Sequence, residues 1–197
     1  MTKKAWYMSL AHAVRIVSVP PVMVGILIVL LFTLRGDIFA SAAEMVLSLC
    51  GLTILPILAY PVSVMIPSIR KKGREGQRSL AMYFSAVGYV AVFVYGLIAG
   101  VGTGLMHIYA GYLFSVVIIL IGNKVFKVRI SGHACSVSGP LVYSGYFLGR
   151  WGIAVGVICW GIILWASLVM KRHTFKEFIL GTLTCLVSFT VGWLIFH

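Results

Sequence analysis

The fold is decided by residues 134–170, ACSVSGPLVYSGYFLGRWGIAVGVICWGIILWASLVM. This stretch contains a single charged residue, Arg150. A helix needs about 20 apolar residues to cross a hydrocarbon core of about 30 Å, so the stretch is long enough for two crossings with a break at the arginine. We therefore expect two membrane-spanning helices, 134–149 and 152–170, that form a tight hairpin.

The rest of the chain is nearly as apolar as this hairpin. Of its 197 residues, 61% are hydrophobic and 10% are charged, and the mean hydropathy is +1.06, whereas soluble domains are about a quarter charged. The composition predicts a single membrane domain over residues 1–197, an all-α polytopic transmembrane helical bundle of six to seven spans. The other expected spans are 18–34, 41–66, 79–101, 104–122 and 176–196. The count is six if 104–122 or 134–149 dips into the membrane without crossing it.

The first residues have a different character. Residues 1–17 mix aromatic, basic and apolar side chains, so we expect a helix that lies along the membrane interface. Pro20-Pro21 then opens the first span, because a proline in the first helical turn lacks only an N–H that would be unpaired there anyway. Pro56 and Pro61 are expected to kink the second span.

The positive charges are distributed unevenly between the two sides of the membrane. With seven spans, the amino terminus and the loops after the second, fourth and sixth spans share one side, which carries all of the 16 Lys and Arg residues except Arg35 and Arg150. The positive-inside rule predicts that this side is cytoplasmic. The net charge of +12 sits in short loops between apolar spans, which fits anionic lipid headgroups, so no nucleic-acid partner is expected. The cations on the basic side are Lys3, Lys4, Arg15, Arg70, Lys71, Lys72, Arg74, Arg78, Lys124, Lys127, Arg129, Lys171, Arg172 and Lys176.

The sequence shows neither a disulfide framework nor a metal-binding framework. The four cysteines have no C-x-x-C spacing, and most lie in apolar runs, so we expect small core residues. They are Cys50, Cys135, Cys159 and Cys185. A zinc site could be assembled from His133, Cys135, His173 and Glu177, but no tight ligand spacing supports one, and no metal or other cofactor is expected.

Three of the basic loops hold residues suited to binding a phosphate. In the first loop, Lys71 and Arg78 are seven residues apart, which on a helix is two turns and nearly the same face. Arginine can bind a phosphate through two parallel hydrogen bonds, and lysine adds a compact charge. Gly73 and Gly76 favour an irregular loop instead of a helix. The alternative function is a solvated loop whose cations only orient the chain.

The second loop carries Ser131-Gly132-His133 directly before the fifth span. A helix start offers unpaired backbone N–H groups and a positive dipole end, which suits an anion. Ser131 can cap the helix, Gly132 allows close approach of the backbone, and His133 can supply a proton. The alternative is a helix cap followed by an interfacial histidine.

The third loop ends with His173, and Glu177 follows four residues later, which would place both side chains on one helical face. A carboxylate on one imidazole nitrogen fixes the tautomer and leaves the other nitrogen free as a nucleophile. Ionisable residues this close to the membrane are costly and are often functional. The alternative is a surface pair in which the helix dipole favours Glu177.

These three loops, in this order, resemble the motifs of the type-2 phosphatidic acid phosphatase superfamily of integral membrane lipid phosphatases, K-x6-R-P, P-S-G-H and S-R-x5-H-x3-D. The resemblance extends from about residue 71 to 181. Ser79 and Ile130 replace prolines, and Glu177 replaces an aspartate. The matching positions are Lys71, Arg78, Ser131, Gly132, His133 and His173, and Glu177 keeps an acidic residue at the last position.

One departure concerns the third motif. The family's phosphate-binding arginine aligns with Ser167, and the serine before it aligns with Ala166. Lys171 and Arg172 are adjacent cations, but neighbouring residues on a helix point about 100° apart. Arg172 can therefore replace the missing arginine only if the last helix begins after His173 and the loop turns Arg172 inward.

The resemblance implies a role for each residue in a metal-independent reaction. His173 would attack phosphorus to form a phosphohistidine, Glu177 would orient it, and His133 would protonate the leaving oxygen. Phosphate-binding residues would stabilise the charge of the transferred group, as phosphoryl transfer requires. These residues are Lys71, Arg78, Ser131, Gly132 and Arg172.

We therefore expect a membrane phosphatase, a hydrolase of lipid metabolism, that removes phosphate from a lipid or isoprenoid mono- or diphosphate at the bilayer surface. Phosphatidic acid and isoprenoid diphosphates are the substrates considered. One alternative is a catalytically silent family member that binds phospholipid headgroups or a partner protein. A third reading is a small transporter or scaffold whose basic loops only set its orientation.

Overall fold

The structure is a computed structural model that describes residues 3–197. Within these residues every regular element is a helix, and no strand is present. The elements are α1 (Lys3–Val17), α2 (Pro20–Leu34), α3 (Ala42–Leu49), η1 (Cys50–Ile54), α4 (Leu55–Met65), α5 (Pro67–Lys71), α6 (Gly73–Ala99), α7 (Thr103–Lys124), α8 (Gly132–Val169) and α9 (Phe175–Phe196). The predicted all-α fold class is confirmed for the described residues, and residues 1 and 2 of the predicted interfacial segment lie outside them.

Five helical segments are long and apolar enough to cross a membrane, and a sixth is added if α1 and α2, which meet at 57°, count as one broken span. These segments support the prediction of an integral membrane protein. α2 begins at Pro20-Pro21 with Val19 as its N-cap, as the proline pair predicts. The segment 42–65 is continuous through α3, η1 and α4, and η1 is a π-helical turn directly before Pro56. The wider turn lets the helix continue past a proline that lacks an N–H.

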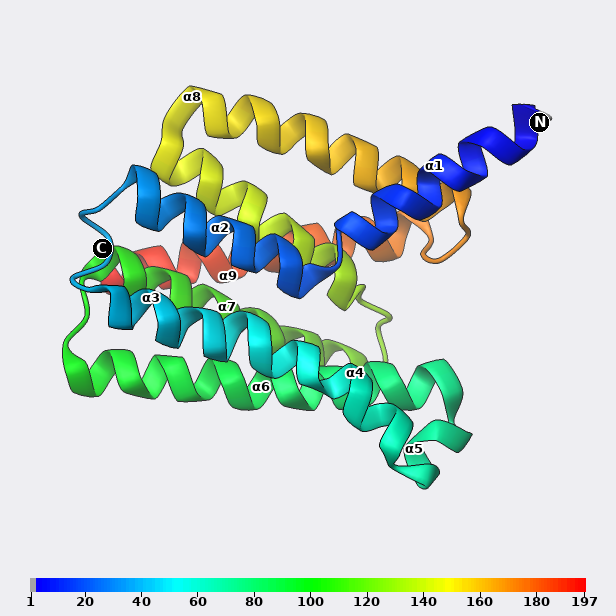
Figure 1. Ribbon diagram of the computed structural model, residues 1–197, viewed down its shortest axis with the longest axis horizontal. Coiled ribbons are helices and arrows are strands. Elements are labelled where there is room, and N and C mark those ends of the chain that lie inside the picture. Colours follow the sequence, from blue (N-terminus) through cyan, green and yellow to red (C-terminus); the bar gives the residue numbers. More distant parts are fainter. Residues whose placement is uncertain (1–2) are drawn as a thin grey trace.

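α8 is a hairpin of two antiparallel arms, 132–148 and 150–169, joined at Gly149, whose φ of 64° and ψ of −144° are not helical. Figure 1 shows α8 doubling back at this point. The arms touch through glycines: a Cβ on Gly156 would lie 3.2 Å from the Leu141 carbonyl oxygen, and one on Gly152 would overlap the Ser144 carbonyl. The hairpin expected from the sequence is therefore present, with its turn one residue before Arg150.

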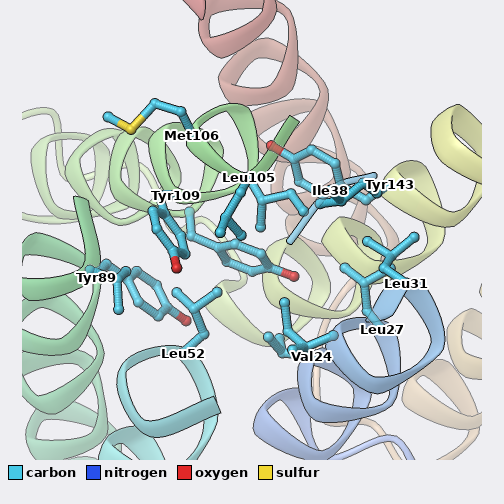
Figure 2. Close-up of a cluster of buried hydrophobic side chains, with 14 of the residues drawn as sticks. Val24, Leu27, Leu31, Ile38, Leu52, Tyr89, Leu105, Met106, Tyr109 and Tyr143 are labelled. Atoms are coloured by element: carbon cyan, nitrogen blue, oxygen red, sulfur yellow. The ribbon is translucent and has the colours of Figure 1, made fainter. Parts of the chain in front are cut away.

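The main core lies where α2, η1, α6, α7 and the first arm of α8 meet (Figure 2). Tyr109 of α7 is fully buried there, and its hydroxyl lies 2.7 Å from Ser48 Oγ of α3. Of the four free cysteines, Cys135 and Cys185 are buried as expected, whereas Cys50 is exposed. The labelled core residues in Figure 2 are Val24, Leu27, Leu31, Ile38, Leu52, Tyr89, Leu105, Met106, Tyr109 and Tyr143.

The three polar loops lie at one end of the bundle. In Figure 1, α5, the α7–α8 loop and the α8–α9 loop are all on the right, together with α1. The α2–α3 loop, the α6–α7 loop and the α8 turn lie at the opposite end. The alternation of spans therefore brings the candidate site residues to one end, as the sequence predicted. Which compartment that end faces stays a prediction.

Candidate active site

A cavity of about 420 Å³ lies at the end of the bundle that carries the polar loops. Its lining comes from α1, α2, α4, α6, α7, the start of α8 and the turn between α8 and α9. The basic and imidazole side chains in this lining are Arg15, Arg74, Arg78, Arg172, His133 and His173. Toward the bundle the lining includes the apolar residues Pro21, Pro56, Met82, Val116 and Ile119, together with small polar residues such as Ser85, Ser115 and Ser136. The cavity thus combines a cationic part with an apolar part.

His133 and His173, from two different loops, both line this cavity. Their rings are nearly parallel, with an interplanar angle of 9° and centroids 6.3 Å apart. The two imidazoles are therefore close without a direct hydrogen bond between them, and a group bound in the cavity can be reached by both. This is the arrangement that a nucleophile and a proton donor need.

His173 lies just before α9 and not on it. Thr174 is the N-cap, and it forms a capping box with Glu177: Thr174 Oγ1 accepts from Glu177 N (3.2 Å), and Thr174 N donates to Glu177 Oε2 (3.2 Å). The expected shared helical face is wrong, because the helix begins only at Phe175. The expected contact still forms, since His173 Nδ1 is 3.4 Å from Glu177 Oε2. Glu177 thus both contacts the imidazole of His173 and completes the helix cap, and Nε2 of His173 is not used in the contact with Glu177.

The surroundings of His173 favour its neutral form. Burial lowers its pKa below the ordinary 6.5, and the positive charge of Arg78 lowers the pKa further. The hydrogen bond to Glu177 opposes this shift. Glu177 is itself paired with Arg129, whose Nε lies 3.2 Å from Glu177 Oε1. At neutral pH His173 is therefore uncharged, which is the state required of a nucleophile.

The turn after α8 brings Arg172 into the cavity. Lys171 N donates to the Leu168 carbonyl (2.9 Å), and Arg172 N donates to the Ser167 carbonyl (3.1 Å). Lys171 has a left-handed φ of 51°, so these bonds form the helix-ending turn known as a Schellman motif. The turn places Arg172 beside His173 in the cavity lining. The condition under which Arg172 could replace the missing arginine is met.

At the start of α8, Ser131 acts as the N-cap. Its Oγ accepts from Ala134 N (3.1 Å), its own N–H donates to the Glu177 carbonyl (3.2 Å), and the residue is buried. Ser131 does not line the cavity, so its hydroxyl has the capping role that was the alternative to phosphate binding. Gly132 lines the cavity, and no atom lies within 4 Å of where its Cβ would be. Backbone of the second loop is therefore accessible to a ligand at this glycine.

In the first loop, the structure separates Lys71 from Arg78. α5 ends at Lys71, and α6 begins at Gly73, whose φ is 55°. The two cations therefore do not share one helix, and Lys71 is exposed and outside the cavity lining. Arg74 and Arg78, one helical turn apart on α6, line the cavity instead.

Two cavity arginines were not selected from the sequence. Arg74 could have been found, because it stands four residues before Arg78 and shares its face once α6 begins at Gly73. Arg15 stands in the last turn of α1. Its only local signal is that it interrupts an apolar run, and its place in the cavity depends on how α1 packs.

The potential zinc ligands do not form a cluster. Within residues 3–197, no group of three His, Cys, Asp or Glu side chains is arranged to hold a metal ion.

Comparison of the chain with family models, with curated proteins and with solved structures finds no match. The assignment of a function therefore depends on the residues and geometry of the cavity.

Proposed function

We propose that the protein is an integral membrane phosphatase of the type-2 phosphatidic acid phosphatase superfamily, which removes phosphate from a lipid or isoprenoid mono- or diphosphate. The single observation that carries the proposal is that His133 and His173 face one cavity together with Arg78 and Arg172. Residues from the three loops that resemble the family motifs thus line one cavity, although these loops are far apart in the sequence. The site lies at the end of the apolar bundle, so the reaction takes place at the membrane interface.

Substrate binding divides between the two parts of the cavity. The arginines bind phosphoryl oxygens through charge-assisted hydrogen bonds, and the backbone at Gly132 allows close approach. Apolar lining residues such as Met82 and Ile119 accept the beginning of the hydrocarbon chain. An amphiphilic phosphate fits this lining better than a soluble sugar phosphate, because the latter would leave the apolar part uncovered.

In the first chemical step, Nε2 of His173 attacks the terminal phosphorus. The bond from that phosphorus to the lipid oxygen breaks in a monophosphate, and the bond to the bridging oxygen breaks in a diphosphate. His133 donates a proton to the departing oxygen, so the lipid alcohol or the lipid monophosphate leaves in protonated form. Glu177 accepts a hydrogen bond from Nδ1 of His173 and stabilises the positive charge that develops on the ring. The arginines stabilise the charge on the equatorial phosphoryl oxygens.

In the second step, water attacks the phosphohistidine. His133, now neutral, takes a proton from that water as the P–N bond breaks, and orthophosphate is released. The cycle returns His173 to its neutral form and His133 to its protonated form. The division of labour therefore requires a neutral His173 and a protonated His133 in the substrate complex, where the negative phosphoryl group offsets the positive charges of the arginines around His133.

A catalytically silent lipid-binding protein is the second candidate, and Ser167 favours it. This residue stands where the family has an arginine, it is buried, and it does not line the cavity. Such a protein would bind phosphate or vanadate and release no product. A transporter or scaffold, the third reading, predicts that alanine at His133 or His173 changes neither anion binding nor any activity.

The test is phosphate release by the detergent-purified protein without added metal. The substrates are phosphatidic acid, phosphatidylglycerophosphate, farnesyl diphosphate and a long-chain polyprenyl diphosphate. We expect turnover of at least one of them that is insensitive to EDTA and abolished by His173→Ala. Vanadate binding without turnover on any substrate would instead support the silent lipid-binding protein.

A further inference from the structure

The cavity holds more positive charge than the protein itself neutralises. Four arginines line it, and Glu75 is the one carboxylate in the lining. Among residues 3–197, the ion pairs are Arg35–Asp37, Arg129–Glu177 and His173–Glu177, so none of the four cavity arginines has a carboxylate partner. Arg15 and Arg172 are partly buried, whereas Arg74 and Arg78 are exposed. A bound anion would offset the repulsion among the four cations and the desolvation of the two partly buried ones.

Arg15 is the cavity arginine that belongs to none of the three loops. It stands in the last turn of α1, separated from the first motif by α2, α3, η1 and α4, and it is partly buried. The positive charge of Arg15 interacts electrostatically with the charges of Arg172, Arg74 and Arg78. It also interacts with the imidazoles of His133 and His173. Arg15 is therefore close to every other basic or imidazole side chain of the site.

The packing of α1 explains why Arg15 points to the cavity. α1 lies along α8 and meets α2 at 57°, and it is at the same end of the bundle as the three polar loops (Figure 1). Its outer side chains are apolar and exposed, with Trp6 63%, Ile16 60% and Val17 64% accessible. A helix of this kind seats its apolar residues in the membrane interface. That seating leaves Arg15 on the side of the phosphate-binding cavity.

We propose that Arg15 is a phosphate-binding residue and that, with Arg172, it replaces the arginine that the third motif lacks at Ser167. The guanidinium of Arg15 hydrogen-bonds to the oxygens of the phosphoryl group that His173 attacks. That the bound anion is a lipid phosphate rests on the proposed function, whereas the anion site itself does not. The amphipathic helix α1 thus becomes one wall of the substrate site.

The experiment measures binding of orthovanadate to the full-length protein in metal-free detergent solution by calorimetry, together with the kinetics of phosphate release. Arg15→Gln removes the guanidinium, and we expect vanadate to bind about 10- to 100-fold more weakly, as the loss of one charged hydrogen-bonding group predicts. Arg15→Lys keeps the charge and loses the paired hydrogen bonds, so its affinity for vanadate is expected to lie between those of wild type and Arg15→Gln. Arg70→Gln is the matched control, because Arg70 is exposed, lies at the same end and does not line the cavity. The control is expected to bind vanadate as wild type does.

The outcomes separate this inference from the proposed function. Vanadate binding that depends on Arg15, without any turnover, supports the anion site and contradicts the phosphatase. Equal affinity of wild type and Arg15→Gln overturns the role of Arg15, whatever the turnover. Absence of vanadate binding to wild type overturns both. If thermal unfolding shows that Arg15→Gln is not folded, wild-type affinity in Arg15→Lys contradicts the proposal, and weaker binding supports it.

Discussion

At the scale of single residues, His173 is held between opposing charges. Arg78 and burial lower its pKa, and Glu177 partly restores it. The surrounding protein thus favours the neutral imidazole that the proposed attack on phosphorus requires, and the carboxylate contacts its Nδ1. The pH dependence of the reaction and the effect of replacing Glu177 both depend on this balance.

The first concerns pH. Protonated His173 cannot attack phosphorus, so kcat/KM should fall as the pH drops through the lowered pKa of His173, which lies below 6.5. The measurement is kcat/KM against pH for the best substrate. An acid limb centred above 6.5, or a rate that does not change through the acid and neutral range, is incompatible with these roles.

The second concerns Glu177, whose two roles can be separated. Glu177→Gln retains a side chain able to complete the capping box but lacks the negative charge, so turnover should fall at least about tenfold with little loss of stability. Because the carboxylate raises the pKa of His173, the acid limb should also move to lower pH. Glu177→Ala should in addition lower the free energy of unfolding by about 0.5–1 kcal/mol. Full activity of the Gln variant would leave Glu177 with a structural role alone.

At the scale of elements, the site depends on how closely α8 and α9 approach. A Cβ on Gly181 of α9 would overlap the Ser131 carbonyl and lie 2.9 Å from Ala134 Cβ. The Ser131 N–H also donates to the Glu177 carbonyl of α9. The start of α8, which carries His133, is therefore positioned directly on the helix that begins beside His173.

Gly181→Ala should consequently push the start of α8 away from α9. We expect a loss of about 1–3 kcal/mol in the free energy of unfolding, as for overpacked sites, and a fall in turnover because the two imidazoles separate. Gly161→Ala on α8 is the control, because no atom lies within 4 Å of its Cβ position. Thermal unfolding and kcat/KM of both variants check this. Wild-type activity in Gly181→Ala would show that the approach of these helices does not set the site.

At the scale of the whole molecule, span length and alternation were sufficient to predict the helical hairpin and the gathering of three loops at one end. The details within the loops could not be predicted in this way, because they depend on local breaks in the helices and on tertiary packing. The break between α5 and α6 removed Lys71 from the site and brought in Arg74. The role of Arg15 depends on α1 packing along α8, a contact between distant segments that no local pattern encodes.

Orientation is also a property of the whole molecule. The bias of Lys and Arg toward one end predicts that this end is cytoplasmic. A topology reporter inserted after Lys72 should give a cytoplasmic signal, and one inserted after Gly100, in the loop at the opposite end, should not. The reverse pair of signals would show that the cations serve anion binding and do not set the topology.

If phosphate passes through His173, protein trapped during turnover must carry a phosphoryl group on this residue. Wild-type protein mixed with a phosphate-labelled lipid substrate and denatured in alkali should carry covalent label that is lost on acid treatment, as a phosphoramidate bond requires. His173→Ala should carry none, while Arg70→Gln should be labelled as wild type is. Phosphate release by an enzyme that never acquires label, or label that persists in His173→Ala, would contradict the account.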